Sequence, residues 1–230
     1  MKKFFKKFAI ILLILIGVVL LTTWIITALF EDQVGRRIVK EVNKSIRSEL
    51  TVGNFDLSIF STFPNAAVNL REVVLKDTKG GVLLEAGNVS CRFGLWSLFG
   101  DDIKVRSIVV SDGALTLETD ERGRANYDIV QSSGLEEEDS GAGFSLETAT
   151  LEDIELIYSD QSASQEAMAH VDQAHFSGKF SSGQFTMNSQ ADLTVHFADL
   201  GGARFIAGKA LKYDARVAVN SKKGIYQLED

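Results

Sequence analysis

Proline, cysteine and histidine are nearly missing from this chain of 230 residues, which contains one, one and three of them. The single proline, Pro64, leaves almost every backbone N–H able to donate, so little in the chain interrupts a β-ladder. The single cysteine, Cys91, cannot form an internal disulfide, which excludes a disulfide-stapled scaffold. We therefore expect a domain that is held together by packing.

Motifs of catalysis and metal binding are lacking as well. His170, His175 and His196 lie near one another in the sequence, but neither H-E-x-x-H nor paired Cys/His spacing accompanies them. The chain contains no G-x-S-x-G elbow, Walker loop or G-x-G-x-x-G turn between strand and helix. We therefore expect no enzyme, no metal and no cofactor, with histidines that are surface or packed residues.

Charge is absent from Phe8 to Phe30, and this run predicts a transmembrane helix over residues 8–30. At about 1.5 Å per residue it reaches roughly 34 Å, enough for a hydrocarbon core of about 30 Å. A cleaved signal peptide is the alternative, but the run exceeds the usual apolar region, and Ile26-Thr27-Ala28 lacks a small residue two positions before the alanine. Four lysines in residues 1–7 predict a cytoplasmic basic tail and a periplasmic remainder.

Residues 31–230 lack an excess of basic residues. The whole chain has a net charge of −7, and residues 31–230 hold 20 basic and 31 acidic residues, a net charge of −11. This total argues against a basic field that attracts nucleic acid or anionic head groups.

Two patterns follow the predicted anchor. In residues 31–48, Val34, Ile38, Val42 and Ile46 recur every four residues and predict a short amphipathic helix. That helix could pack on the following domain or lie at the membrane interface. From Leu50 onward the apolar period is two, which predicts antiparallel strands over 49–133 and 144–230, separated by an acidic linker at 134–143.

One strand pattern recurs in VNLREVVLKD (68–77), IKVRSIVVSD (103–112) and FSLETATLED (144–153). Each has apolar residues at offsets 0, 2, 5 and 7, and an aspartate at offset 9. Side chains alternate faces along a strand, so an extra residue between offsets 2 and 5 would return both halves to one face and bend the strand. We predict bulges at 71–72, 106–107 and 147–148, and turn roles for Asp77, Asp112 and Asp153.

Residues 1–130 resemble the N-terminal region of the AsmA family. The resemblance rests on the anchor and helix, the V-x-x-F-x-L-S strand with FP before the first repeat, and the A-x-x-V strand that runs into LWSLFG. It also rests on I-K-V-x-S-I-V-V-x-D-G and the closing G-R-A-N-Y-D. The order and spacing of these elements, more than any one of them, make it specific.

The resemblance implies a Gram-negative inner-membrane protein, related to chorein-like bridge proteins, that handles phospholipid or another acyl-chain lipid in outer-membrane biogenesis. The expected fold is mainly β, with a curved antiparallel sheet of repeating bent strands that forms an apolar groove. Bridge-like members are longer, so a truncated product, a segment of a larger assembly and a short member that loads or receives lipid all stay open. The groove candidates are Phe55, Leu57, Val68, Leu70, Leu75, Val89, Phe93, Leu95, Ile103, Val105, Val110, Leu115 and Leu117.

A structural reading is the alternative to lipid handling. In it the apolar face closes against a second sheet, as in a β-jellyroll of the lipopolysaccharide-export type or an assembly factor of the cell envelope. Both readings require one apolar and one polar face. The discriminating observation is whether the apolar face is open to a ligand.

Overall fold

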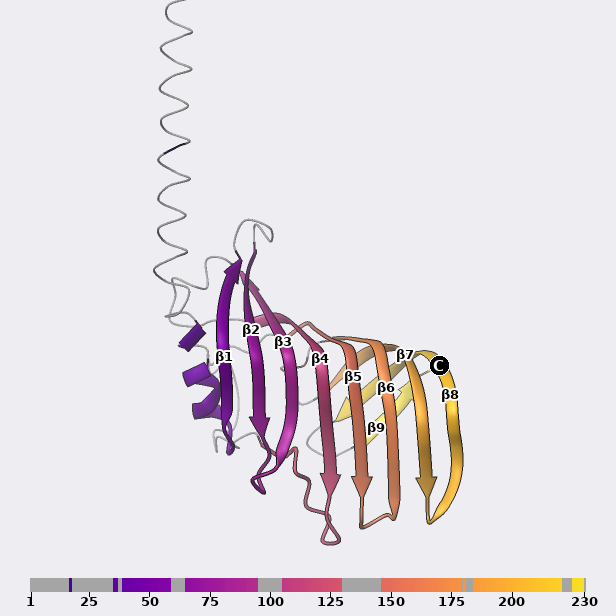
Figure 1. Cartoon of the computed structure of the whole chain (residues 1–230). Helices are drawn as coiled ribbons and strands as arrows, with labels where there is room; N and C mark the ends of the chain where they lie inside the picture. Colours follow the sequence, from indigo (N-terminus) through magenta and orange to yellow (C-terminus); the bar gives the residue numbers. More distant parts are fainter. Residues whose placement is uncertain are drawn as a thin grey trace, which may run out of the picture.

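The described part of the chain is mainly a single curved β-sheet (Figure 1). The computed structural model describes residues 17, 35–36, 39–58, 65–94, 105–129, 146–178, 180, 184–220 and 225–229. Nine strands lie side by side in chain order. They are β1 (Leu50–Ser58), β2 (Asn65–Lys76), β3 (Val82–Gly94), β4 (Val105–Thr119), β5 (Thr148–Asp160), β6 (Gln165–Gly178), β7 (Gln184–Leu200), β8 (Ala203–Asn220) and β9 (Ile225–Glu229).

Neighbouring strands are antiparallel, as the alternating pattern predicted, with one exception. β4 and β5 pair in parallel, from Ser107 opposite Thr148 to Thr119 opposite Asp160. A parallel pair needs a long crossover, and residues 120–147 are long enough to supply one. The predicted acidic linker at 134–143 belongs to this connection and lies outside the described residues, yet strands from both sides of it form one sheet.

Part of the predicted N-terminal helix is present. Residues 35–36 and 39–45 are helical, inside the predicted amphipathic helix, and Val42 packs against the buried apolar cluster of the sheet. Ile46, which follows the helical residues, is buried as well, so this end of the helix packs on the domain. No helix among the described residues is long and apolar enough to cross a membrane. Except for Gly17, the predicted anchor at 8–30 lies outside those residues.

A line of irregular backbone crosses six neighbouring strands. At one position on each strand the regular pairing is interrupted, and these positions face one another across the sheet. Glu72, Asp112 and Asp153 have φ of 54°, 61° and 55°, which places them in the left-handed region. We call this set the kink line; its members are Gly53, Glu72, Gly87, Asp112, Asp153 and Asp172.

The kink line changes which alternate residues face the core. Leu70 and Val73 lie on either side of the polar pair in β2, and both are buried, at 3% and 2% exposure. The prediction that both halves share one apolar face is therefore correct here, but the predicted bulge at 71–72 is wrong. The ladders of β2 with β1 and β3 keep their register through this point, because the neighbouring strands are interrupted at the same level.

The other two predicted bulges differ from each other. In the β3–β4 ladder, Arg92 pairs with Ser107 and Phe93 with Val105, so Arg106 is an extra residue and the predicted bulge at 106–107 is present. The bulge predicted at 147–148 is not seen, because β5 begins at Thr148.

The spatial repeat also differs from the sequence repeat. β4 and β5 pair at a constant offset of 41 residues, which is the spacing between the second and third predicted segments. The first segment is out of step: Glu72 lies level with Asp112 through Gly87, 40 residues away, whereas the sequence pattern implied 35.

Only one of the three predicted turn aspartates is in a turn. Asp77 follows β2, and its Oδ1 accepts hydrogen bonds from the backbone N–H groups of Lys79 and Gly81, each at 2.7 Å. Asp112 and Asp153 instead lie within β4 and β5, where their left-handed backbone belongs to the kink line. Aspartate tolerates this conformation better than most residues, so its presence signals left-handed backbone rather than a turn.

Candidate functional site

One face of the sheet carries the apolar side chains of nearly every strand, and we call it the apolar face. Because residues opposite one another in neighbouring strands share a face, the register defines its rows. One row runs from β1 to β8 through Phe55, Leu70, Val89, Val110, Leu151, Ala174, Ala191 and Tyr213. The next row runs through Val52, Val73, Ala86, Gly113, Ile154, Val171, Leu193 and Leu211.

The predicted groove residues that the structure describes lie in the first four strands of this face. Six are buried: Val68, Leu70, Val89, Phe93, Val105 and Val110. Four are partly exposed: Phe55, Leu75, Leu115 and Leu117. Leu57 pairs with Val68 in the β1–β2 register, but its side chain lies outside the description, as do residues Leu95 and Ile103.

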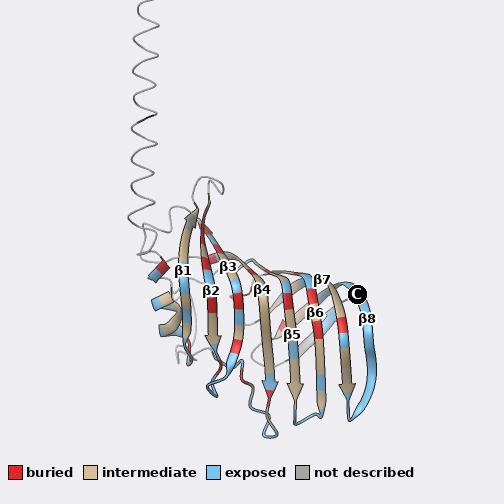
Figure 2. Ribbon diagram, viewed as in Figure 1, coloured by how far each residue is buried: buried red, intermediate tan, exposed pale blue. Residues whose placement is uncertain are grey.

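Burial of the apolar face is uneven along the sheet. Phe93 and Ile154 are both 0% exposed, although they lie in β3 and β5 of a single sheet. Side chains on the inside of a curl converge and cover one another, so this burial indicates that the apolar face is the inner face. The face opens at β8, where Leu211 and Tyr213 are 46% and 37% exposed. Figure 2 shows the change, with buried residues on β2 to β7 and a largely exposed β8.

The opening at β8 involves the backbone as well as side chains. Every residue from Ala203 to Asp214 is exposed. β9 pairs with β8 only from Arg216 to Asn220, so the outer edge of the first two thirds of β8 has no partner strand among the described residues. Apolar side chains next to this edge are accessible both from the inner side and from the edge itself.

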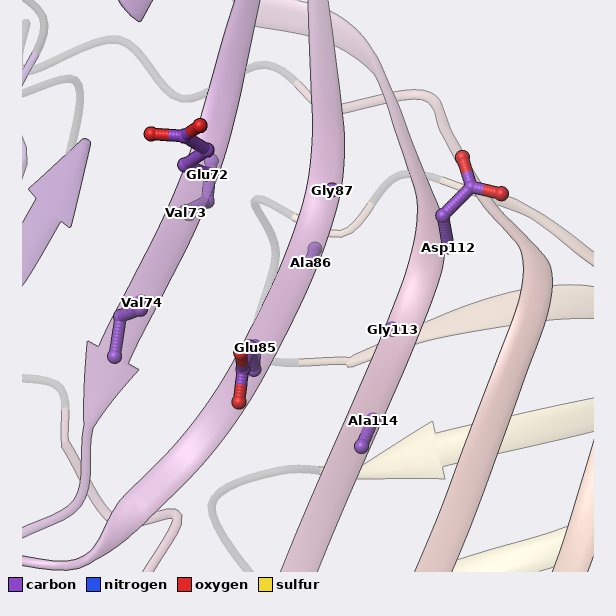
Figure 3. Close-up of a pocket in the computed structure, with 9 residues that line it drawn as sticks. All are labelled: Glu72, Val73, Val74, Glu85, Ala86, Gly87, Asp112, Gly113 and Ala114. Carbon is purple, nitrogen blue, oxygen red and sulfur yellow. The ribbon is translucent and has the colours of Figure 1, made fainter. Parts of the chain in front are cut away.

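The opposite face is polar, and it is hollowed where the kink line crosses β2, β3 and β4 (Figure 3). Val74, Glu85 and Ala114 are cross-strand partners on this face. The hollow has a volume of about 370 Å³, and its lining includes Glu72, Glu85 and Asp112. No cation lines it, and in the described part of the chain no three His, Cys, Asp or Glu side chains are arranged to hold a metal ion.

The histidines have carboxylate or hydroxyl neighbours. The His170 ring lies between Glu155, with Nδ1 2.8 Å from Oε1, and Asp153, with Nε2 3.2 Å from Oδ1. The hydrogen bond to Glu155, together with the charges of Glu155, Asp153 and Asp172, raises the pKa of His170. His175 shares a 3.0 Å hydrogen bond with Thr150.

Sequence reasoning missed the exposed end of the apolar face. The candidates stop at Leu117, whereas Leu211 and Tyr213 are the accessible large side chains of the two rows above. Their alternation in LKYDARVAV, residues 211–219, carried the same signal as the earlier strands.

The described residues of this face supply a continuous apolar surface from β1 to β8, and Leu211 and Tyr213 are accessible at its β8 end. A comparison of the chain with protein-family models finds no match, and a comparison with curated proteins finds none either.

Proposed function

We propose that this chain is an AsmA-like protein, anchored in the inner membrane, that binds or transfers phospholipid along its apolar face during outer-membrane biogenesis. The observation that carries the proposal is the continuity of that face across β1 to β8 together with its opening at Leu211 and Tyr213. An exposed apolar surface must be covered by protein or by ligand. Burial of an acyl chain contributes about 25 cal/mol per Å² and requires no charged site.

Lipid carried by the purified full-length protein tests the proposal. After purification in a neutral detergent, extraction and mass spectrometry should recover phospholipid in stoichiometric amount. Leu211→Arg should lower lipid occupancy by at least about tenfold, because a guanidinium beside an acyl chain loses water without gaining a partner. Since Leu211 is 46% exposed, the change should leave the fold intact by circular dichroism.

Ala210→Arg is the matched control. Ala210 is exposed, adjoins Leu211 in β8 and belongs to the row of Thr194 and His170 on the polar face. The same arginine placed there should leave lipid occupancy unchanged. Equal losses in the two variants would contradict binding along the apolar face.

The alternative is a structural or assembly module of the cell envelope, and one observation favours it. Much of the apolar face is already covered, with Phe93 and Ile154 fully buried. A protein that is lipid-free after purification, and that takes up no added phospholipid, would support this alternative.

The proposed topology has its own test. With residues 1–7 cytoplasmic and everything after residue 30 periplasmic, a reporter that is active only in the periplasm should be active when fused after Asp230. Activity of a cytoplasmic reporter at the same position, with silence of the periplasmic one, would overturn the topology.

A further inference from the structure

A second hollow lies at the β1 end of the sheet, between the helical residues near the N-terminus and β1. Its volume is about 670 Å³, within the range of roughly 300–1,000 Å³ that is typical of ligand pockets. Val52 and Phe55 of β1 and Val39 of the helix supply apolar surface. Arg36, Lys40, Asn43 and Lys44 complete the lining.

The cations of this hollow recur with helical spacing. Arg36, Lys40 and Lys44 are four residues apart in the sequence, and Lys40 and Lys44 lie one turn apart on the same side of the helical residues 39–45. Lys44 contacts Glu41 at 2.8 Å, but both side chains are more than half exposed, and such pairs contribute little. Lys40 makes no ion pair with any residue that the structure describes.

This local charge is opposite to that of the whole protein. Residues 35–48 contain five basic residues and one acidic residue, a net charge of +4, in a chain whose net charge is −7. The chain total therefore does not describe the charge of this segment, which is basic.

The two walls of the hollow are held together by direct contacts. The Asn43 side chain accepts a hydrogen bond from the Leu50 N–H at 2.7 Å and donates one to the Leu50 carbonyl at 2.9 Å. It thereby acts as a short strand partner for the start of β1. Gly35 approaches so closely that an added Cβ would lie 2.1 Å from the Phe55 ring. The hollow is thus formed before any ligand arrives.

From this geometry we propose that the hollow binds one anionic phospholipid, with its phosphate on Lys40 and Lys44 and an acyl chain against Val52 and Phe55. A cationic rim above an apolar floor matches a ligand that has a negative head and an apolar tail. Phe55 pairs with Leu70, so the tail lies at the β1 end of the apolar face. The inference rests on the proposed function for the class of ligand, and adds its head-group charge and place of binding.

Short-chain lipids below their micelle concentration test the proposal with the full-length protein in a neutral detergent. Phosphatidylglycerol should bind at least about tenfold more tightly than phosphatidylcholine of the same chains, and added salt should reduce the difference. Lys40→Glu should remove that preference. Lys79→Glu is the matched control, since Lys79 is an exposed lysine of the turn between β2 and β3 that makes no ion pair with any described residue. Equal binding of the two lipids, or equal effects of the two variants, would overturn the proposal.

A second set of measurements separates a bound lipid from attraction to a membrane surface. Val39→Ser should weaken binding of the short-chain lipid, while binding of glycerol phosphate, which has no tail, stays unchanged. The hollow would be refuted as a lipid site if the protein bound phosphatidylglycerol vesicles through Lys40 but did not bind the monomeric lipid.

Failure of this head-group proposal can be told apart from failure of the proposed function. Leu211→Arg, at the far end of the sheet, should leave the preference for phosphatidylglycerol intact. If Leu211→Arg loses its co-purified lipid while Lys40→Glu keeps the head-group preference, the hollow is not the head-group site, and the proposed function stands.

Discussion

Gly113 lies beside the kink line and has no room for a side chain. It follows the left-handed residue Asp112 and pairs with Ala86 of β3. A Cβ added to Gly113 would lie 1.9 Å from the Glu85 carbonyl oxygen and 2.8 Å from the Ala86 Cα. Both are backbone atoms of a central strand, so Gly113→Ala would have to push β3 and β4 apart.

The expected cost follows from overpacking. Forcing one extra methyl group into a well-packed interior costs about 1–3 kcal/mol, and the backbone contacts place Gly113→Ala at the upper end. For a chain of this size each kcal/mol lowers the melting temperature by about 2–4 °C, so we expect a loss of roughly 4–12 °C. Thermal unfolding of the full-length protein in one detergent, followed by circular dichroism, measures it.

Gly94→Ala is the control. Gly94 ends β3, and no atom lies within 4 Å of its added Cβ. Alanine there should be neutral or stabilise the protein by up to about 1 kcal/mol, because it restricts the unfolded chain. Equal melting temperatures for the two variants would show that β3 and β4 do not approach as closely as the structure has them.

Three further substitutions and one labelling experiment test other parts of the structure. Glu72→Gly should raise the free energy of unfolding by up to about 1 kcal/mol, because glycine adopts a φ of 54° without the strain of a side chain; a destabilised variant in urea titration would contradict this. Asn126→Ala should lower the free energy of unfolding by about 1–3 kcal/mol, because Asn126 is 0% exposed and its side chain accepts a hydrogen bond from the Glu118 N–H and donates one to the Thr116 carbonyl. An unchanged midpoint in urea would contradict this prediction. The hydrogen bond to Glu155 raises the pKa of His170, so protonated His170 stabilises the folded protein fully below the unfolded pKa of about 6.5, and this stabilisation is lost as pH rises through the higher folded pKa. His170→Gln should therefore lower the melting temperature at about pH 6 by more than at about pH 9. An equal lowering at both pH values would refute this linkage. Burial raises the pKa of the Cys91 thiol to about 11, so a thiol reagent should label it only after unfolding in urea, and rapid labelling of the native protein would show that β3 opens.

Local patterns in the sequence predicted the strands and the face on which their apolar residues lie. Alternation is a property of each strand alone, so Val68 and Leu70 could be placed together without knowledge of their neighbours. The polar pair after Leu70 also revealed the change of alternation, and burial of Val73 confirms it.

The left-handed backbone that changes the alternation at Glu72 was not predictable from one strand. A bulge adds a residue against a regular partner, whereas at Glu72 both partner strands are interrupted at the same level, and no register shift results. Glu72 is neither glycine nor asparagine, so its own identity does not predict left-handed backbone. Gly53 and Gly87 face Glu72 across the two ladders, so the irregular backbone is predictable only when the three strands are considered together.

The parallel pairing of β4 and β5 was also outside local reasoning. Strand direction depends on the path of the connecting chain, and alternation is the same in either direction. The 41-residue spacing between IKVRSIVVSD and FSLETATLED nevertheless equals the register offset of that pair. Equivalent residues of a parallel pair lie side by side, so a repeat that aligns two segments in sequence also aligns them in space.

The kink line ends between β6 and β7, and this end separates the covered and the open parts of the apolar face. β7 keeps its alternation from Ala191 through Leu193, so its ladder with β6 shifts by one residue at Asp172. β8 continues the regular pairing, with Leu211 opposite Leu193. Because only the last strands run without interruption at this level, their side chains belong to a regular sheet edge rather than to the packed inner curl. The exposure of Leu211 beside the buried Val171 and Ile154 of the same row follows from that change, and it places the accessible end of the proposed lipid-binding face at β8.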